Sequence, residues 1–101
     1  MSGNMIEASI IVDHSEGLHA RPSVKLTKLA KGFTSRIELS TTPEGPWIDA
    51  KSIVKVMAMR APRHATLHFR AQGEDAREAV NALIGLVMRD FDEDHVHAAG
   101  G

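Results

Sequence analysis

The residues best suited to chemistry in this sequence lie in the run Gly17-Leu18-His19-Ala20-Arg21-Pro22. A histidine stands directly before a segment with a helical pattern, and an arginine follows two residues later. The first N–H groups of a helix lack intrahelical acceptors and carry the positive end of the helix dipole, so they favour an anion. The same environment favours neutral imidazole, whose free ring nitrogen is a nucleophile near neutral pH. His19 and Arg21 are therefore predicted to form a site that stabilises a phosphoryl group carried on His19.

This run resembles the active-site motif of the HPr family, the histidine-containing phosphocarriers of the phosphoenolpyruvate-dependent phosphotransferase system. Three further segments resemble HPr segments in the same order: Lys31-Gly32-Phe33-Thr34-Ser35, Ala50-Lys51-Ser52-Ile53 and Gln72-Gly73-Glu74-Asp75-Ala76. The resemblance covers roughly residues 5–90. It implies that His19, through Nδ1, accepts a phosphoryl group from phospho-enzyme I and passes it to a downstream acceptor domain of the enzyme IIA type. It also implies that Arg21 stabilises the phosphoryl charge and that Pro22 has a structural role.

Ser52 stands before a short predicted helix, where a hydroxyl commonly caps the first turn. The resemblance implies a second role, because in many family members a dedicated serine kinase, with its phosphorylase activity, acts on the matching serine to regulate the system. A phosphate there would add negative charge at a helix N-terminus and would repel an acidic partner. The capping and the regulatory interpretations both stay open at this point.

A partner-binding surface is predicted between His19 and Ser52. One face of the first predicted helix differs from its core-facing stripe and carries Ala20, Val24, Thr27 and Lys31. The second helix adds further apolar residues, Ile53, Val54 and Met57, although one of Ile53 and Met57 is expected to lie in the core. The basic residues around this patch are Arg21, Lys28 and Lys51. An apolar centre with a charged rim is typical of a transient interface.

The elements that must position these residues follow from hydrophobic periodicity. Alternating apolar and polar residues predict strands at residues 5–12, 36–40, 47–49 and 65–71. Helical spacing predicts helices at 20–31, 53–59 and 74–87, with Gly32 in the left-handed position after the first and Pro62 ending the second. The order is β-α-β-β-α-β-α. It predicts an α+β open-faced β-sandwich, in which three helices cover one face of a four-stranded, mainly antiparallel sheet.

The composition bounds the domain count and the partners. With 101 residues, one HPr-like domain is expected over residues 5–91, between a flexible N-terminus at 1–4 and a disordered tail at 92–101. Twelve basic against thirteen acidic residues and only four aromatic ones argue against nucleic-acid binding. No run approaches the ~20 apolar residues of a membrane span. The absence of cysteine fits a reducing compartment, so a cytoplasmic protein is expected. A monomer is expected as well.

The remaining histidines do not form a predicted metal site. His64 and His68 share one face of a predicted strand but lie about 13 Å apart, too far for one ion to bridge. His95 and His97 lie in the tail, where only weak adventitious binding is expected. Neither a metal nor another cofactor is therefore expected, and the glycine spacing indicates no phosphate-binding loop.

Alternatives remain at this stage. From the residues alone, His19 can simply cap the helix, and the chain can be a non-catalytic regulatory HPr-like module with unphosphorylated His19. A ferredoxin-like RNA- or metabolite-binding domain begins with the same order of elements. Within the phosphocarrier interpretation, sugar transport and a nitrogen-related regulatory branch both stay open. The turn at residues 60–64 replaces one that commonly carries glycines in the family, which bears on the choice of downstream partner.

Overall fold

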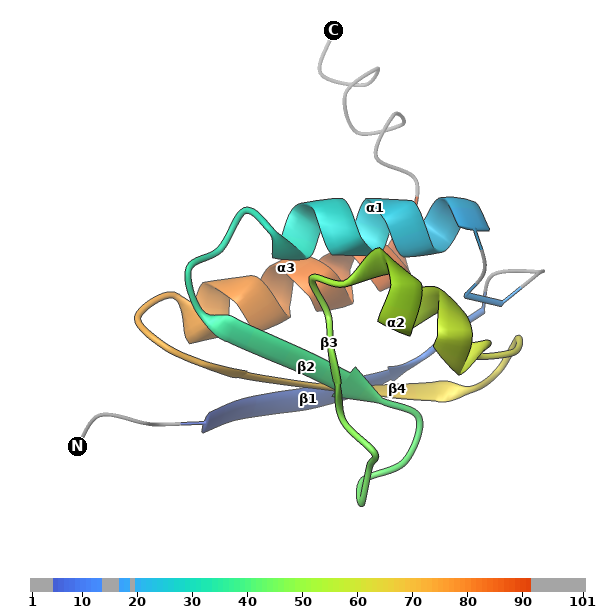
Figure 1. Ribbon diagram of the computed structural model, residues 1–101, viewed down its shortest axis with the longest axis horizontal. Helices are drawn as coiled ribbons and strands as arrows, with labels where there is room; N and C mark the ends of the chain where they lie inside the picture. The colour runs from blue at the N-terminus through green and yellow to red at the C-terminus, as the bar shows by residue number, and fades with distance from the viewer. Residues whose placement is uncertain (1–4, 14–16, 19, 92–101) are drawn as a thin grey trace, which may run out of the picture.

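The computed structural model describes residues 5–13, 17–18 and 20–91 (Figure 1). The strands are β1 (Met5–Ile11), β2 (Arg36–Ser40), β3 (Ile48–Asp49) and β4 (Thr66–Gln72), and the helices are α1 (Ala20–Ala30), α2 (Ile53–Met59) and α3 (Ala76–Met88). The predicted order of elements is confirmed, with boundaries that differ by a residue or two. The expectations for residues 1–4 and 92–101 fall outside the described part of the chain.

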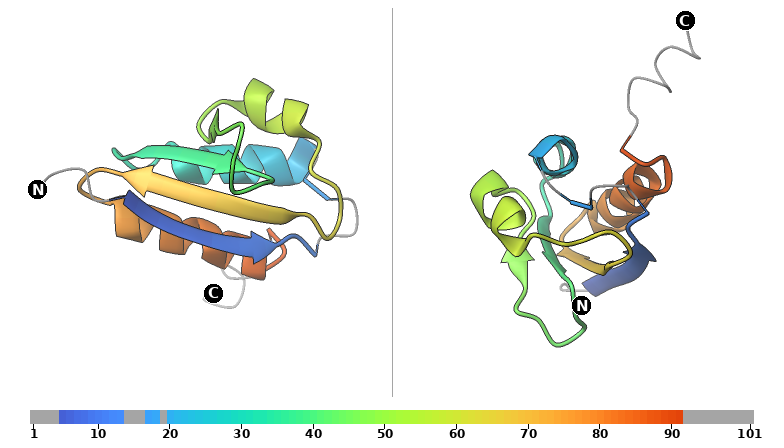
Figure 2. Two further views of the ribbon diagram at one scale, coloured as in Figure 1. Left: turned by 90° about the horizontal axis from the view of Figure 1, so that it is seen from below. Right: turned by 90° about the vertical axis from the view of Figure 1, so that its right-hand side faces the viewer.

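The sheet has the strand order β1-β4-β2-β3, and every neighbouring pair is antiparallel. β1 pairs with β4 along its whole length, from Met5 opposite Gln72 to Ile11 opposite Thr66. The helices lie together on one face of the sheet and leave the other open (Figure 2). The α+β open-faced sandwich is therefore confirmed. The register also places the end of β1 beside the turn that precedes β4, and this turn supports the candidate site.

The core lies between the sheet and the helices, as the periodicity predicts. Alternate residues of β4 are buried, and α3 buries the stripe of residues that its helical spacing indicates. These two elements contribute Leu67, Phe69, Ala71, Ala76, Ala79, Val80, Leu83, Leu86 and Val87 to the core. From α1 come the predicted residues Pro22, Leu26 and Ala30.

The prediction for Thr27 is wrong, because its side chain is buried rather than on the partner-binding face. Helix α1 packs against both α2 and α3, so its buried stripe is wider than the spacing of its apolar residues suggests. Ser23 is buried on the same helix for the same reason.

The end of α1 also differs from its prediction. Gly32 is not among the described residues with positive φ, so the expected left-handed cap is wrong there. The N–H groups of Gly32 and Phe33 instead donate to the carbonyls of Leu29 and Ala30, three residues back, at 3.0 and 3.2 Å. These bonds tighten the last turn and satisfy two carbonyls that α-helical bonding leaves free.

A carboxylate joins the start of α3 to the loop before β2. Asp75 accepts hydrogen bonds from the backbone N–H groups of Thr34 and Ser35, each at 2.9 Å, and from the Ser35 hydroxyl. The hydroxyl bond, followed by the Thr34 N–H, favours the charged carboxylate and lowers the pKa of Asp75 from its usual 3.8 to about 2. This link fixes the end of the domain opposite the candidate site.

Candidate functional site

The chain that leads into α1 is held by the turn at residues 60–65. The Val12 N–H donates to the Ala65 carbonyl at 2.8 Å, and the His64 N–H donates to the Val12 carbonyl at 2.6 Å. The Leu18 N–H donates to the Ala61 carbonyl at 2.8 Å. The backbone is therefore fixed both at the end of β1 and immediately before α1.

Gly17 fits against this turn because it has no side chain. Its φ is +71°, and a Cβ built there would lie 2.5 Å from the Ala61 carbonyl oxygen and 2.8 Å from the Pro62 carbonyl carbon. Both are backbone atoms that cannot move aside without shifting the turn. Leu18 follows with its side chain fully buried, and the Ser23 hydroxyl reaches its carbonyl at 3.5 Å. Leu18 is thus an anchor at the position directly before His19.

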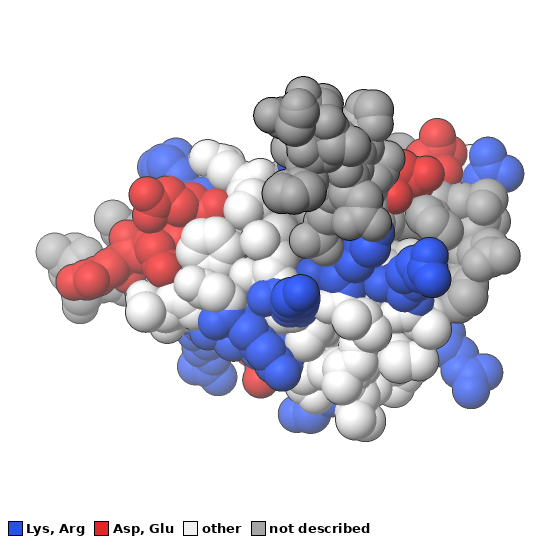
Figure 3. All heavy atoms as spheres, turned by 90° about the horizontal axis from the view of Figure 1, so that it is seen from above, with Lys and Arg blue, Asp and Glu red and all other residues white. Residues whose placement is uncertain are grey.

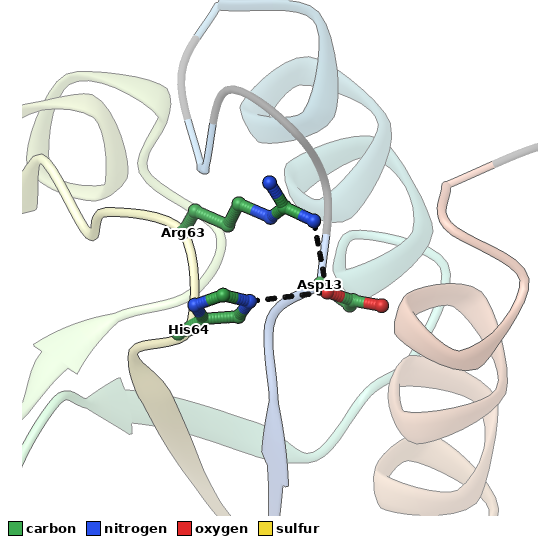
Figure 4. A network of polar contacts seen from close by, with 3 residues as sticks. All are labelled: Asp13, Arg63 and His64. Atoms are coloured by element: carbon green, nitrogen blue, oxygen red, sulfur yellow. Dashed lines mark ion pairs between the residues drawn. The ribbon is translucent and has the colours of Figure 1, made fainter.

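The turn that holds this segment contains two residues in the left-handed region. Arg60 and His64 have φ values of 51° and 74°, a conformation that favours glycine. Asp13 lies beside the turn, with its Oδ1 3.4 Å from His64 Nε2 and 3.7 Å from Arg63 Nη2 (Figure 4). All three side chains are largely exposed, so these pairs contribute at most about 1 kcal/mol. The backbone contacts, rather than the ion pairs, fix the segment.

His19 lies outside the described residues, so its predicted role stays a prediction. Its neighbour Ala20 is exposed and is the first residue of α1. Arg21 is also exposed, and the first turn of α1 contains no acidic residue. An anion at this end of the helix would meet the Arg21 guanidinium and the first N–H groups, with no carboxylate of that turn to repel it.

An apolar groove adjoins the start of α1. It is lined by Leu18, Ala20, Val54, Met57, Ala58, Arg60, Ala61 and Pro62. Three residues predicted for the partner-binding surface, Ala20, Val54 and Met57, come together here. Val54 is 74% exposed and Met57 42%, while Val24 on the adjoining face of α1 is 52% exposed. Exposed apolar side chains gathered beside a groove are typical of a protein-binding surface.

Sequence reasoning missed the far wall of this groove. Ala61 and Pro62 belong to the turn after α2, and the contacts that bring this turn to Gly17 and Leu18 span more than forty residues of the chain. The only local signal was Pro62, which was interpreted as a helix terminator. Helix α2 ends at Met59, and the N–H of the left-handed residue that follows it, Arg60, donates to the Met57 carbonyl.

The expectation that one of Ile53 and Met57 lies in the core is wrong. Ile53 is half-buried and Met57 is exposed, whereas Val56 is the fully buried residue of α2. A helix of seven residues has few positions that can face the core, and in α2 the buried position is that of Val56. Both other side chains are therefore available at or near the surface.

The predicted basic rim divides into two kinds of residue. Lys28 is exposed on α1, as expected. Lys51 is half-buried, and its Nζ donates to the Phe33 carbonyl at 2.7 Å, so its amine joins the start of α2 to the loop after α1. Lys and Arg side chains gather over the middle of the helical face, whereas Asp and Glu side chains gather towards its edges (Figure 3).

Ser52 caps α2, which confirms the local prediction. Its Oγ accepts a hydrogen bond from the Lys55 N–H at 3.3 Å, and its carbonyl accepts one from the Val56 N–H at 3.0 Å. The side chain is half-buried at the edge of the helix that carries Val54 and Met57. A charge added at Ser52 would therefore lie close to the apolar groove.

Within residues 5–13, 17–18 and 20–91, no three His, Cys, Asp or Glu side chains come together in a way that would hold a metal ion. Among those same residues, none of the helices combines the length and the apolar character needed to span a membrane.

Comparison with known proteins gives a consistent result. Residues 6–89 match the family described as the PTS HPr component phosphorylation site. The phosphocarrier protein HPr of Cupriavidus necator is 38% identical over 89 residues, which cover 88% of this chain and 98% of that protein. A multiphosphoryl transfer protein of Haemophilus influenzae is 37% identical over 89 residues, which cover 87% of this chain and only 18% of the relative. The crystal structure of HPr-C-His from Thermoanaerobacter tengcongensis superimposes with a TM-score of 0.80 at 31% identity, covering 87% of this chain and 97% of that one.

Proposed function

This chain belongs to the HPr family, the phosphocarriers of the phosphotransferase system, and on that premise we propose the specific step that it performs. His19 accepts a phosphoryl group from phospho-enzyme I, which obtains it from phosphoenolpyruvate. It then passes the group to a downstream acceptor domain of the enzyme IIA type. The match to one segment of a multiphosphoryl transfer protein supports phosphoryl-transfer partners of this kind.

The chemistry is a displacement at phosphorus in each direction. A neutral imidazole nitrogen of His19 forms a bond to phosphorus while the bond between phosphorus and the donor breaks, and the reverse occurs with the acceptor. Arg21 and the first N–H groups of α1 share the negative charge of the phosphoryl group. The exposed position of Arg21 leaves one side of the site to the partner, which completes it and excludes water during transfer.

One observation carries this proposal: the site is anchored on one side and open on the other. Leu18 is fully buried and its backbone is bonded to the turn at residues 60–65, whereas Ala20 and Arg21 are exposed. The residue between them in the chain is His19. A nucleophile at this position in the chain follows a fixed backbone and precedes an exposed segment, which suits a group that must meet two protein partners in turn.

The proposal is tested by intact mass after incubation with phosphoenolpyruvate and an active enzyme I. We expect one added phosphoryl group that survives alkali and is lost in acid, as a phosphohistidine requires. His19→Ala should abolish it, and the matched control His68→Ala, on the outer face of β4, should retain it. If the native chain stays unmodified while the same enzyme I phosphorylates its own carrier, the chain is an inert regulatory module.

A second proposal concerns Ser52, which we infer to be a regulatory phosphorylation site. It is supported by the position of Ser52 at the N-terminus of α2, five residues before the groove residue Met57. A phosphate there adds nearly two negative charges beside a surface that binds an acidic partner. We expect Ser52→Asp to slow transfer from enzyme I severalfold and Ser52→Ala to leave it nearly unchanged. Equal rates in both variants would contradict the regulatory role.

The compartment and the oligomeric state of the chain follow from the proposed transfer. We propose a monomeric carrier in the cytoplasm, because the surface around α1 and α2 must be free to meet donor and acceptor in turn. The absence of cysteine fits a reducing compartment. Light scattering at the concentration of the transfer assay tests the monomer, and a stable dimer that buries the groove would contradict it.

A further inference from the structure

Helix α3 ends in a turn that fixes the position of Phe91, the last described residue. The Asp90 N–H donates to the Val87 carbonyl at 2.9 Å, and the Phe91 N–H donates to the Leu86 carbonyl at 2.8 Å. Asp90 has a φ of 59°, so the pair of bonds and the left-handed residue form a Schellman motif. Both partners of its usual apolar contact, Leu86 and Phe91, are buried. The last described residue is therefore held in a defined place.

That place is beside α1. Phe91 is only 2% exposed and belongs to the core. Its carbonyl oxygen accepts a hydrogen bond from Lys25 Nζ at 2.7 Å. Lys25 lies in the middle of α1, so the chain leaves the domain next to the helix that begins at the candidate site.

The neighbouring face of α1 is basic. Arg21, Lys25 and Lys28 are spaced four and three residues apart, which places them along one side of the helix. No acidic residue occurs in α1, and Arg21 and Lys28 are exposed. Val24, 52% exposed, lies within the same stretch, and a shallow groove is lined by Ala20, Arg21, Val24 and Lys25. We call Arg21, Lys25 and Lys28 the basic face.

The three residues that follow Phe91 in the sequence are all acidic, namely Asp92, Glu93 and Asp94. Each residue extends the chain by at most about 3.6 Å, so the Cα of Asp94 cannot lie more than about 11 Å from that of Phe91. Arg21 and Lys28 lie about 6 and 4.5 Å along the helix axis from Lys25. The covalent connection therefore limits the separation enough for the three carboxylates to reach the cations of the basic face.

We propose that residues 92–94 dock on the basic face of α1 and compete there with acidic protein partners. The basic face and Val24 adjoin the start of α1, so this segment lowers the affinity of the chain for partners that approach the transfer surface. The competition with transfer partners rests on the proposed function, whereas the docking itself does not. Because the attraction between the carboxylates and the basic face is electrostatic, docking weakens as ionic strength rises.

The test is binding of a synthetic polyglutamate peptide, measured by fluorescence anisotropy at low salt. The first variant removes the three tail charges and the second removes three exposed charges outside α1 and α3. The tail variant is Asp92→Asn/Glu93→Gln/Asp94→Asn. The control variant is Glu7→Gln/Glu44→Gln/Glu74→Gln. Both change the net charge equally, so long-range attraction of the peptide changes equally in the two. Exposed pairs contribute about 0.3–0.5 kcal/mol each, and three of them correspond to a factor of about five to twelve, so we expect the tail variant to bind about five- to twelvefold more tightly than the control variant.

A second readout locates the effect within the full-length chain. In amide NMR spectra we expect the tail variant to shift the resonances of Arg21, Lys25 and Lys28 relative to the native chain, and high salt to shift the native spectrum the same way. The control variant should leave these resonances in place. Equal peptide affinities in the two variants, or unchanged α1 resonances in the tail variant, would overturn the proposal. No phosphotransfer partner is used, so failure here is distinct from failure of the phosphocarrier function.

Discussion

Replacing Gly17 with alanine tests how the segment before α1 is held. An L-residue at a φ of +71° costs about 1–2 kcal/mol relative to glycine. The new Cβ would also lie 2.5 Å from the Ala61 carbonyl oxygen and 2.9 Å from the Arg63 nitrogen. Overpacking against atoms that cannot turn aside costs about 1–3 kcal/mol more. We expect Gly17→Ala to lower the free energy of unfolding by about 2–5 kcal/mol, a large part of the stability of a domain this size.

Gly32→Ala is the matched control. Gly32 is not among the described residues with positive φ, and a Cβ there meets only the Leu29 carbonyl oxygen at 3.3 Å. Its substitution should change the unfolding free energy by no more than about 1 kcal/mol, in either direction.

Urea denaturation of the native chain and the two variants measures both effects as shifts in midpoint at constant slope. Under conditions where Gly17→Ala is folded, it should also transfer phosphoryl groups more slowly, because the Leu18 anchor is displaced. The reasoning is refuted if Gly17→Ala destabilises the domain no more than Gly32→Ala does.

Three further predictions concern a carboxylate, a cap and the groove. The lowered pKa of Asp75 contributes stability that is complete above its unfolded pKa near 4 and is lost as pH falls through about 2. In Asp75→Asn, unfolding free energy should therefore fall less steeply than in the native chain between these values, and parallel acid titrations would contradict this. Ser52→Ala should lose about 1 kcal/mol in urea unfolding while Ser52→Asp keeps its cap; equal losses would argue against capping. Val54→Asp should stay within about 0.5 kcal/mol of native stability yet raise the KM for enzyme I, whereas Met88→Asp on α3, equally exposed, should not.

Local periodicity was sufficient for the elements and most of the core. In β4, the alternation of Leu67, Phe69 and Ala71 with polar residues is both the sequence pattern and the observed burial. Thr27 was misplaced because its burial depends on two helices packing against α1, which the spacing within one helix does not reveal. The prediction of a left-handed cap at Gly32 was wrong because glycine permits positive φ without requiring it.

The contacts that hold the candidate site in place could not be predicted from local sequence patterns. The motif placed Arg21 in the first turn of α1, but the turn that fixes Leu18 lies more than forty residues away in the sequence. The same is true of the contact between Lys25 and Phe91, separated by 66 residues. Such contacts depend on how the sheet and helices assemble, and neither partner carries a local signal for the other.

The most direct test of the central claim is whether the phosphoryl group on the chain can leave again. The phosphorylated chain, freed of phosphoenolpyruvate, is mixed with unphosphorylated enzyme I and pyruvate and followed by intact mass. A carrier that uses His19 must return its phosphoryl group, so the modified mass should revert to that of the native chain. If the chain keeps its phosphoryl group while the same enzyme I dephosphorylates its own carrier, the modification is an end point and the phosphocarrier account is contradicted.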